Sequence, residues 1–169
     1  PPKNAKDLFN TGYSAYQKGL YANAIASFTR AIEAYPEYWL AYRLRGDSKR
    51  RSNDNQGAIA DYTATLKINP KDPTSYNLRG VAWSNLKDHE KAIVDYTQAV
   101  TLDPKYHWGY YNRALSLEAV GKIKEALKPG QKLRDVFIGT PIRQDTAIGI
   151  GKRMPMVAEN VKKVFHPRT

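Results

Sequence analysis

Between residues 73 and 104, apolar and small side chains recur with the period of an α-helix and form two helical faces. The residues of the two faces are Tyr76, Gly80 and Trp83, then Ala92, Tyr96, Ala99 and Val100. Asp72 followed by Pro73 is typical of a helix start, and Asp88 is a second expected N-cap. Because proline cannot continue a helix, Pro104 ends the second one. This segment is predicted to fold as two helices joined by a turn.

The same pattern repeats along the chain with a period of 34 residues. The recurring residues are Gly12, Gly46 and Gly80, then Ala24, Ala58, Ala92 and Ala126, and finally Pro36, Pro70 and Pro104. Residues 39–72 and 73–106 share 12 identities in 34 positions without a gap. Small residues at these positions let two helices approach closely, so we expect Gly80 and Ala92 to lie where a helix pair packs.

This arrangement resembles the tetratricopeptide repeat (TPR) family, whose 34-residue unit alternates aromatic and small residues and closes on proline. The resemblance implies an all-α fold, a right-handed α-solenoid of helix–turn–helix units with a C-terminal capping helix. The units are expected at 5–38, 39–72 and 73–106, with a degenerate fourth at 107–138, in a TPR domain of residues 5–138. One departure is Arg45, Arg79 and Arg113, which stand where the family has Leu.

The fourth unit loses the pattern after its first helix, because Pro129-Gly130 interrupts the second. Residues 139–169 are not a repeat and begin as loop. A helical pattern returns at about 155–165, where an apolar face would cover the open end of the last repeat. The alternatives are that this helix lies in the groove of its own chain or docks on another chain.

The family resemblance places binding residues on the first helix of each unit, which lines a concave groove. The expected groove residues are Phe9, Tyr13, Tyr16, Arg43, Asp47, Arg50, Asn77, Val81, Trp108, Tyr111 and Asn112. Aromatic rings give large contact areas at little entropic cost, and arginine binds carboxylates through a planar fork. We therefore expect aromatic anchors at both ends of the groove, with Arg43 and Arg50 selecting acidic groups of the ligand.

One TPR groove type, the carboxylate clamp for chaperone C-terminal tails, is not expected here. Its Lys, Arg and Asn residues are replaced at the matching positions by Phe9, Tyr13, Leu44, Thr74 and Leu78. The sequence therefore argues against a role as a chaperone-tail cochaperone.

The chain is basic, with a net charge of +11, and part of the excess lies in the second unit. That unit carries seven Lys and Arg against four Asp and Glu, and its densest run is Lys49-Arg50-Arg51. We interpret the run as a solvated helix end whose cations favour the helix dipole. The alternative is a contact for nucleic acid or an acidic partner. Two hypotheses fit the recurring Arg45, Arg79 and Arg113. They form structural ion pairs with Asp61 and Asp95, or they form a row that binds phosphate groups.

No catalytic constellation is apparent, and no cofactor or metal is expected. The chain has no Cys, its three His lie in separate units, and Gly149-Ile150-Gly151-Lys152 lacks the spacing of a phosphate loop. No apolar stretch is long enough to span a membrane, and no signal peptide is visible. A cytoplasmic location is favoured, with periplasm or secretion as alternatives if a leader has been removed.

The sequence predicts a protein–protein interaction scaffold or adaptor rather than an enzyme. Its expected ligand is a peptide or helix of a partner protein, with or without acidic groups. Two alternatives remain, which are nucleic-acid binding through the basic second unit and tail, and dimerisation of an otherwise monomeric chain through the tail helix.

Overall fold

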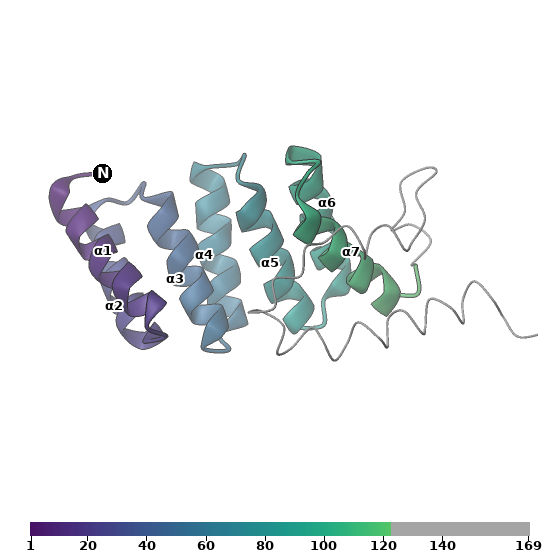
Figure 1. Ribbon diagram of the computed structural model, residues 1–169, viewed down its shortest axis with the longest axis horizontal. Coiled ribbons are helices and arrows are strands. Elements are labelled where there is room, and N and C mark those ends of the chain that lie inside the picture. Colours follow the sequence, from purple (N-terminus) through teal and green to yellow (C-terminus); the bar gives the residue numbers. More distant parts are fainter. Residues whose placement is uncertain (123–169) are drawn as a thin grey trace, which may run out of the picture.

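The computed structural model describes residues 1–122, which form seven helices and contain no strand. The helices are α1 (Lys3–Gln17), α2 (Tyr21–Ala34), α3 (Trp39–Arg51), α4 (Asn55–Ile68), α5 (Pro73–Asn85), α6 (His89–Leu102) and α7 (His107–Ala119). Figure 1 shows them following one another along the long axis of the molecule. The predicted all-α repeat fold is confirmed, and none of these seven helices has the length and apolarity needed to cross a bilayer.

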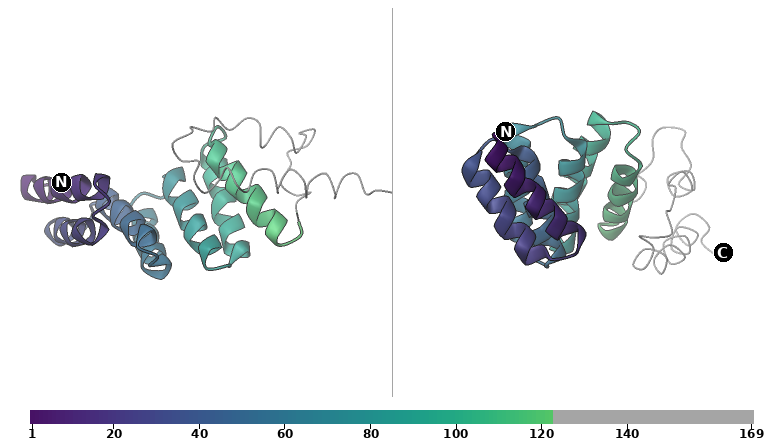
Figure 2. Two further views of the ribbon diagram at one scale, coloured as in Figure 1. Left: turned by 60° about the horizontal axis from the view of Figure 1, so that its bottom comes forward. Right: turned by 60° about the vertical axis from the view of Figure 1, so that its left-hand side comes forward.

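Successive helices pack against one another as antiparallel pairs, and the pairs stack (Figure 2). The first helices of neighbouring pairs also contact each other, since α1 meets α3, α3 meets α5 and α5 meets α7. No comparable contact joins the second helices α2, α4 and α6. A layered stack curves toward the side whose elements lie closest together, so α1, α3, α5 and α7 form its inner, concave face.

Close approach within each pair depends on glycine, as the sequence predicts. A Cβ atom built on Gly80 would lie 2.6 Å from the Tyr96 ring, and one on Gly12 would lie 2.8 Å from the Phe28 ring. Both rings are almost fully buried, so they have no room to move aside. A side chain at either glycine would push the two helices of its pair apart.

The predicted caps are present at two helix starts. Asp72 accepts a hydrogen bond from the Ser75 amide at the start of α5, and Asp88 accepts one from the Lys91 amide at the start of α6. Both bonds satisfy an amide that the helix itself leaves free.

The turns inside the pairs show a regularity that the sequence reading missed. The four residues of the described chain with positive φ are Gly19, Asn53, Lys87 and Gly121, each 34 residues from the next. Each turn therefore needs one left-handed residue, and only two of the four positions are occupied by glycine.

The expected second helix of the fourth unit, its Pro129-Gly130 interruption, the tail of residues 139–169 and the helix at about 155–165 all lie outside the described residues. The four helices that carry the predicted groove residues, α1, α3, α5 and α7, lie within them.

Candidate inner-face binding site

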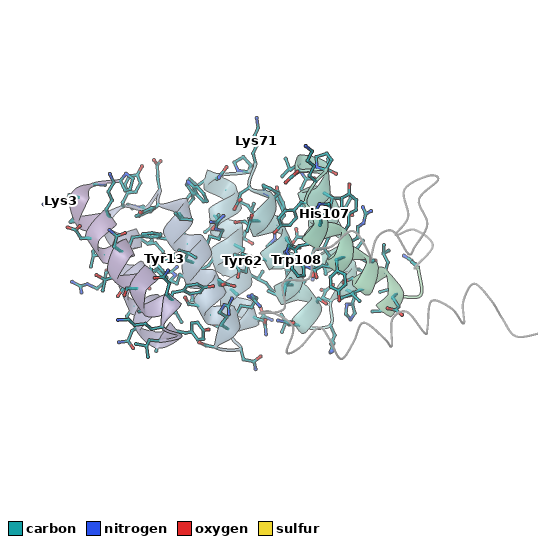
Figure 3. The ribbon with its side chains drawn as sticks, viewed as in Figure 1. Lys3, Tyr13, Tyr62, Lys71, His107 and Trp108 are labelled. Atoms are coloured by element: carbon teal, nitrogen blue, oxygen red, sulfur yellow. The ribbon has the colours of Figure 1, made fainter. Side chains whose placement is uncertain are left out.

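All eleven predicted groove residues lie on the four inner helices α1, α3, α5 and α7. Their side chains differ widely in exposure. Tyr13 and Trp108 are 42% and 40% exposed, whereas Asp47 and Tyr111 are only 6% and 5% exposed. Figure 3 shows Tyr13 on α1 and Trp108 on α7, towards opposite ends of the stack.

Three polar contacts tie neighbouring inner helices together. The Tyr16 hydroxyl of α1 donates a hydrogen bond to Asp47 of α3. Arg43 of α3 lies 3.1 Å from the carboxylate of Asp72, the residue that caps α5. Each of these contacts is specific to one junction, and the residues that make them differ between units.

The third contact joins α5 to α7. The amide nitrogen of Asn112 donates to the side-chain oxygen of Asn77 at 2.9 Å, and Asn77 is almost fully buried. With the two contacts above, every junction between neighbouring inner helices carries a side-chain bridge. The inner face is thereby held in one arrangement before any ligand arrives.

Asp47 is the centre of the largest of these clusters. Arg50 donates to it at 2.5 and 3.1 Å, Arg51 donates from Nε at 3.0 Å, and the Tyr62 hydroxyl lies 3.5 Å away. Burial by itself raises the pKa of Asp47, but the charge of Arg50 and the hydrogen bonds from Tyr16, Arg50 and Arg51 lower it overall. Asp47 is therefore a buried, ionised carboxylate.

The same cluster changes the titration of Tyr16. Burial and the neighbouring Asp47 carboxylate raise the pKa of the Tyr16 hydroxyl to about 12. Ionising Tyr16 would place a second negative charge against Asp47 and remove the hydrogen-bond donor that joins α1 to α3. Tyr16 therefore remains a donor at neutral pH.

The basic run at the end of α3 is not the freely solvated helix end that we expected from the sequence. Lys49 pairs with Asp61 at 2.9 Å, and Arg50 and Arg51 both pair with Asp47. The Lys49 and Arg50 side chains are about four-fifths buried against these partners. Only Arg51 keeps a large exposed fraction, 45% of its side chain.

Aromatic rings form a continuous row along α1. Phe9 stacks on Tyr13 with ring centroids 6.3 Å apart, and Tyr13 stacks on Tyr16 at 6.4 Å. Tyr38, from the loop before α3, stacks on Phe9 with ring centroids 4.9 Å apart. Tyr13 is the most exposed ring of this row and the one most available to a ligand.

The other end of the inner face carries a smaller aromatic group. Trp108 meets Tyr111 edge to face, with ring centroids 6.1 Å apart. Tyr111 is buried and supports the exposed Trp108, while Val81 of α5 is half-buried on the helix next to α7. Tyr111 is therefore part of the packing, and truncating it would disturb the fold as well as the surface.

The recurring arginines have the structural role expected from their period. Arg45 donates to Asp61 from two nitrogens at 2.9 and 2.7 Å, and Arg79 donates to Asp95 at 2.8 and 2.7 Å. Each also reaches a threonine of the preceding pair, so the fork links two units. These two carboxylates leave neither guanidinium free to join a phosphate-binding row.

Arg113 continues this series on α7 without the same partners. It lies over Tyr110 as Arg79 lies over Tyr76, but its buried Nε has no hydrogen-bond partner among residues 1–122. The burial lowers the pKa of Arg113. The residue one repeat after Asp95 is Pro129, so the sequence supplies no Asp at that position.

Sequence reasoning missed two residues of the inner face. Tyr38 lies outside the helix positions that the family pattern marks, and Arg51 was counted only as part of a charged run. The signal for Arg51 was its spacing, since it stands four residues after Asp47 on the same helix face.

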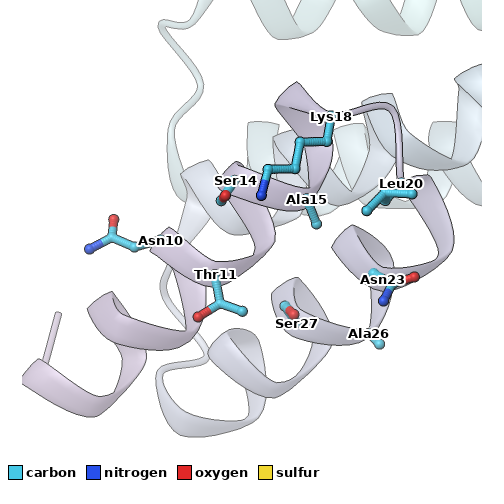
Figure 4. Close-up of a pocket in the computed structure, with 9 residues that line it drawn as sticks. All are labelled: Asn10, Thr11, Ser14, Ala15, Lys18, Leu20, Asn23, Ala26 and Ser27. Atoms are coloured by element: carbon cyan, nitrogen blue, oxygen red, sulfur yellow. The ribbon is translucent and has the colours of Figure 1, made fainter.

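Other surfaces of the described residues offer little chemistry. No group of three or more His, Asp or Glu side chains within residues 1–122 is placed to hold a metal ion. An open hollow of about 650 Å³ lies between α1 and α2, lined by short polar side chains such as Thr11, Ser14 and Ser27 (Figure 4). It contains none of the predicted groove residues. Thr11, in its lining, stands one repeat before Arg45, and Arg45 reaches Thr29 of the preceding pair. In later units this face therefore packs on the unit before it.

Comparison with known proteins identifies the repeats. Residues 9–73 and residues 73–106 match two models of the tetratricopeptide repeat. No curated protein matches the chain significantly.

Several solved structures share the fold. The crystal structure of MamA has a TM-score of 0.71 and 24% identity, over 74% of this chain and 73% of MamA. The first TPR of Spaghetti (RPAP3), bound to the HSP90 peptide SRMEEVD, has a TM-score of 0.70 and 22% identity, over 72% and 96% of the two chains. The first TPR domain of human RPAP3 has a TM-score of 0.69 and 22% identity, over 75% and 100%.

Proposed function

Because the chain belongs to the tetratricopeptide repeat family, we propose that its inner face binds a peptide or helix of a partner protein, as an adaptor or assembly scaffold. The observation that carries the proposal is the pair of exposed aromatic rings, Tyr13 and Trp108, on the first and last inner helices. Large exposed rings on a well-packed surface are typical anchors of protein interfaces.

The bridges between the inner helices support a preformed site. Tyr16–Asp47, Arg43–Asp72 and Asn77–Asn112 fix the spacing of all four inner helices. A ligand then loses less free energy to ordering of the protein when it binds. A rigid face spanning four helices suits an extended or helical segment better than a small molecule, which needs an enclosed pocket.

The ligand class is not that of the chaperone-tail clamp. The Spaghetti (RPAP3) domain was solved with an HSP90 peptide, which is consistent with peptide binding by this fold. In this chain the clamp positions carry Phe9, Tyr13, Leu44, Thr74 and Leu78, so the cationic and amide groups that grip a terminal carboxylate are missing. We propose a partner that inserts apolar side chains against the two aromatic ends.

The experiment is capture of partners from a source lysate on the immobilised chain, with and without nuclease. The test variant is Tyr13→Ala combined with Trp108→Ala, and the control is Val94→Ala, which truncates a 68% exposed side chain on the outer helix α6. We expect discrete proteins on the wild type and the control, and their loss from the test variant. Equal capture by all three chains would refute the inner-face assignment, and loss after nuclease treatment would indicate nucleic-acid binding instead.

A further inference from the structure

We propose that Arg51, beside the exposed ring of Tyr13, is an anchor for an acidic side chain of the partner segment, next to an apolar residue of the same segment. This inference rests on the proposed function and names the chemistry of its ligand. It concerns a residue outside both the sequence-predicted groove set and the clamp positions.

Arg51 is held in place by contacts with three residues. Its Nε donates to Asp47 at 3.0 Å, and its guanidinium lies 5.4 Å from the Tyr16 ring and 6.0 Å from the Tyr21 ring. Despite these contacts, 45% of the side chain is exposed. An arginine fixed in this way loses little rotamer freedom when a ligand pairs with it.

Arg51 also has donors beyond the one that binds Asp47. A guanidinium carries five N–H donors and can offer a second bidentate edge from its two terminal nitrogens. Within residues 1–122, Asp47 is its one ion-pair partner, through Nε, and the Tyr16 and Tyr21 side chains also interact with it through hydrogen bonds. A carboxylate approaching from solvent can therefore bind the outer edge without displacing Asp47.

The surrounding charge favours an anion. Around α3 there are five cations, Arg43, Arg45, Lys49, Arg50 and Arg51, paired with three carboxylates, Asp47, Asp61 and Asp72. The three carboxylate side chains are at most 10% exposed. The side chains of Arg43, Arg45, Lys49 and Arg50 are at most 22% exposed. The excess positive charge is therefore most accessible at Arg51.

The apolar half of the site adjoins this charge. Tyr16 stacks on Tyr13 with ring centroids 6.4 Å apart, and the Arg51 guanidinium lies 5.4 Å from the same Tyr16 ring, so Tyr13 and Arg51 both neighbour Tyr16. A short peptide can place an acidic side chain on Arg51 and an apolar one against Tyr13. One exposed ion pair also predicts a shallow salt dependence, unlike the steep dependence of a polyanion.

The test is an NMR titration of the isotope-labelled full chain with two capped dipeptides, acetyl-Glu-Phe-amide and acetyl-Gln-Phe-amide, at up to about 10 mM because a single anchor binds weakly. The two probes have nearly the same shape and differ in charge. We expect shifts of the α1 and α3 amides, with the Glu probe binding about threefold tighter or more.

Three variants assign the effect. In Arg51→Gln the preference for the Glu probe should disappear, while Tyr13→Ala should weaken both probes equally and keep their ratio. The matched control is Arg30→Gln, which removes the same charge from an exposed site on the outer helix α2 and should keep both affinities. Thermal melts of all variants verify that each remains folded.

Equal affinity of the two probes for the wild type, no binding of either probe, or a preference that survives Arg51→Gln would each overturn the proposal. So would a single-stranded oligonucleotide that displaces the Glu probe and loses affinity steeply with salt. If the dipeptides fail while Tyr13→Ala with Trp108→Ala still abolishes partner capture, the inner-face function stands and only the acidic anchor falls.

Discussion

Replacing Arg79 by Met should destabilise the protein, whereas the same replacement of Arg113 should not. Arg79 forms a bidentate pair with Asp95, whose side chain is 5% exposed, and a third hydrogen bond to Thr63. In Arg79→Met the Asp95 carboxylate stays buried without its cation. Removing one partner of a buried pair costs about 3–5 kcal/mol, and the partial exposure of Arg79 reduces our expectation to about 2–3 kcal/mol.

Arg113 occupies the same repeat position on α7, but no ion pair joins it to a carboxylate of residues 1–122, and Pro129 stands one repeat after Asp95. Its replacement loses a contact with the Tyr110 ring at 5.4 Å, worth about 0.5–1 kcal/mol. It also removes a buried Nε that has no partner in the described part of the chain, and such burial costs about 1–3 kcal/mol. Because the second effect is at least as large, we expect Arg113→Met to leave stability unchanged or raise it by about 1 kcal/mol.

The assay is thermal unfolding followed by circular dichroism, with Arg30→Met as the exposed control. At about 3 °C per kcal/mol, Arg79→Met should lower Tm by roughly 6–9 °C, Arg30→Met should leave it unchanged, and Arg113→Met should leave it unchanged or raise it by about 3 °C. Arg45→Met should fall in between, because Lys49 remains 2.9 Å from Asp61. Equal losses from Arg79→Met and Arg113→Met would refute the argument that the carboxylate, rather than the arginine position itself, provides the stability.

Two further predictions concern the turns and the inner-face cluster. Lys87 has a φ of 67°, so Lys87→Gly should raise the free energy of unfolding by about 0.5–1 kcal/mol. Asn53→Gly should raise it by less, because asparagine tolerates this conformation better than lysine does. Denaturant midpoints of the two variants test this order. Tyr16 has its folded-state pKa raised from 10.0 to about 12, so its contribution to stability is complete below pH 10 and is lost as pH rises towards 12. A Tm that falls as steeply in Tyr16→Phe as in the wild type over that range would show that other tyrosines dominate.

The fold was readable from the sequence because its determinants are local and repeated. Gly80 and Tyr96 mark a close helix crossing in one unit, and the same crossing recurs between Gly12 and Phe28. Caps such as Asp72 depend on neighbours three residues away. A period of 34 residues averages these signals over several copies, so errors in any one copy matter little.

The inner face was less predictable because its contacts cross between units. The sequence marked Arg43 and Arg50 as ligand-selecting groups, yet each is already paired, with Asp72 and Asp47. Nothing in a linear pattern reveals that Tyr16, 31 residues before Asp47, donates to it. Positions that vary between units are therefore ambiguous, since they can serve either a ligand or one particular junction.

This ambiguity has a consequence for specificity. A ligand that recruited Arg50 would have to compete with Asp47, a carboxylate held by Tyr16 as well as by Arg51. Such competition leaves a buried charge with fewer partners, which costs more than an exposed ion pair returns. The ligand must then be selected by groups that stay accessible despite their contacts within the protein. These groups are the exposed aromatic rings and the exposed part of the Arg51 guanidinium. A partner that matches this face is therefore expected to be mainly apolar, with a single acidic residue near its contact with α1.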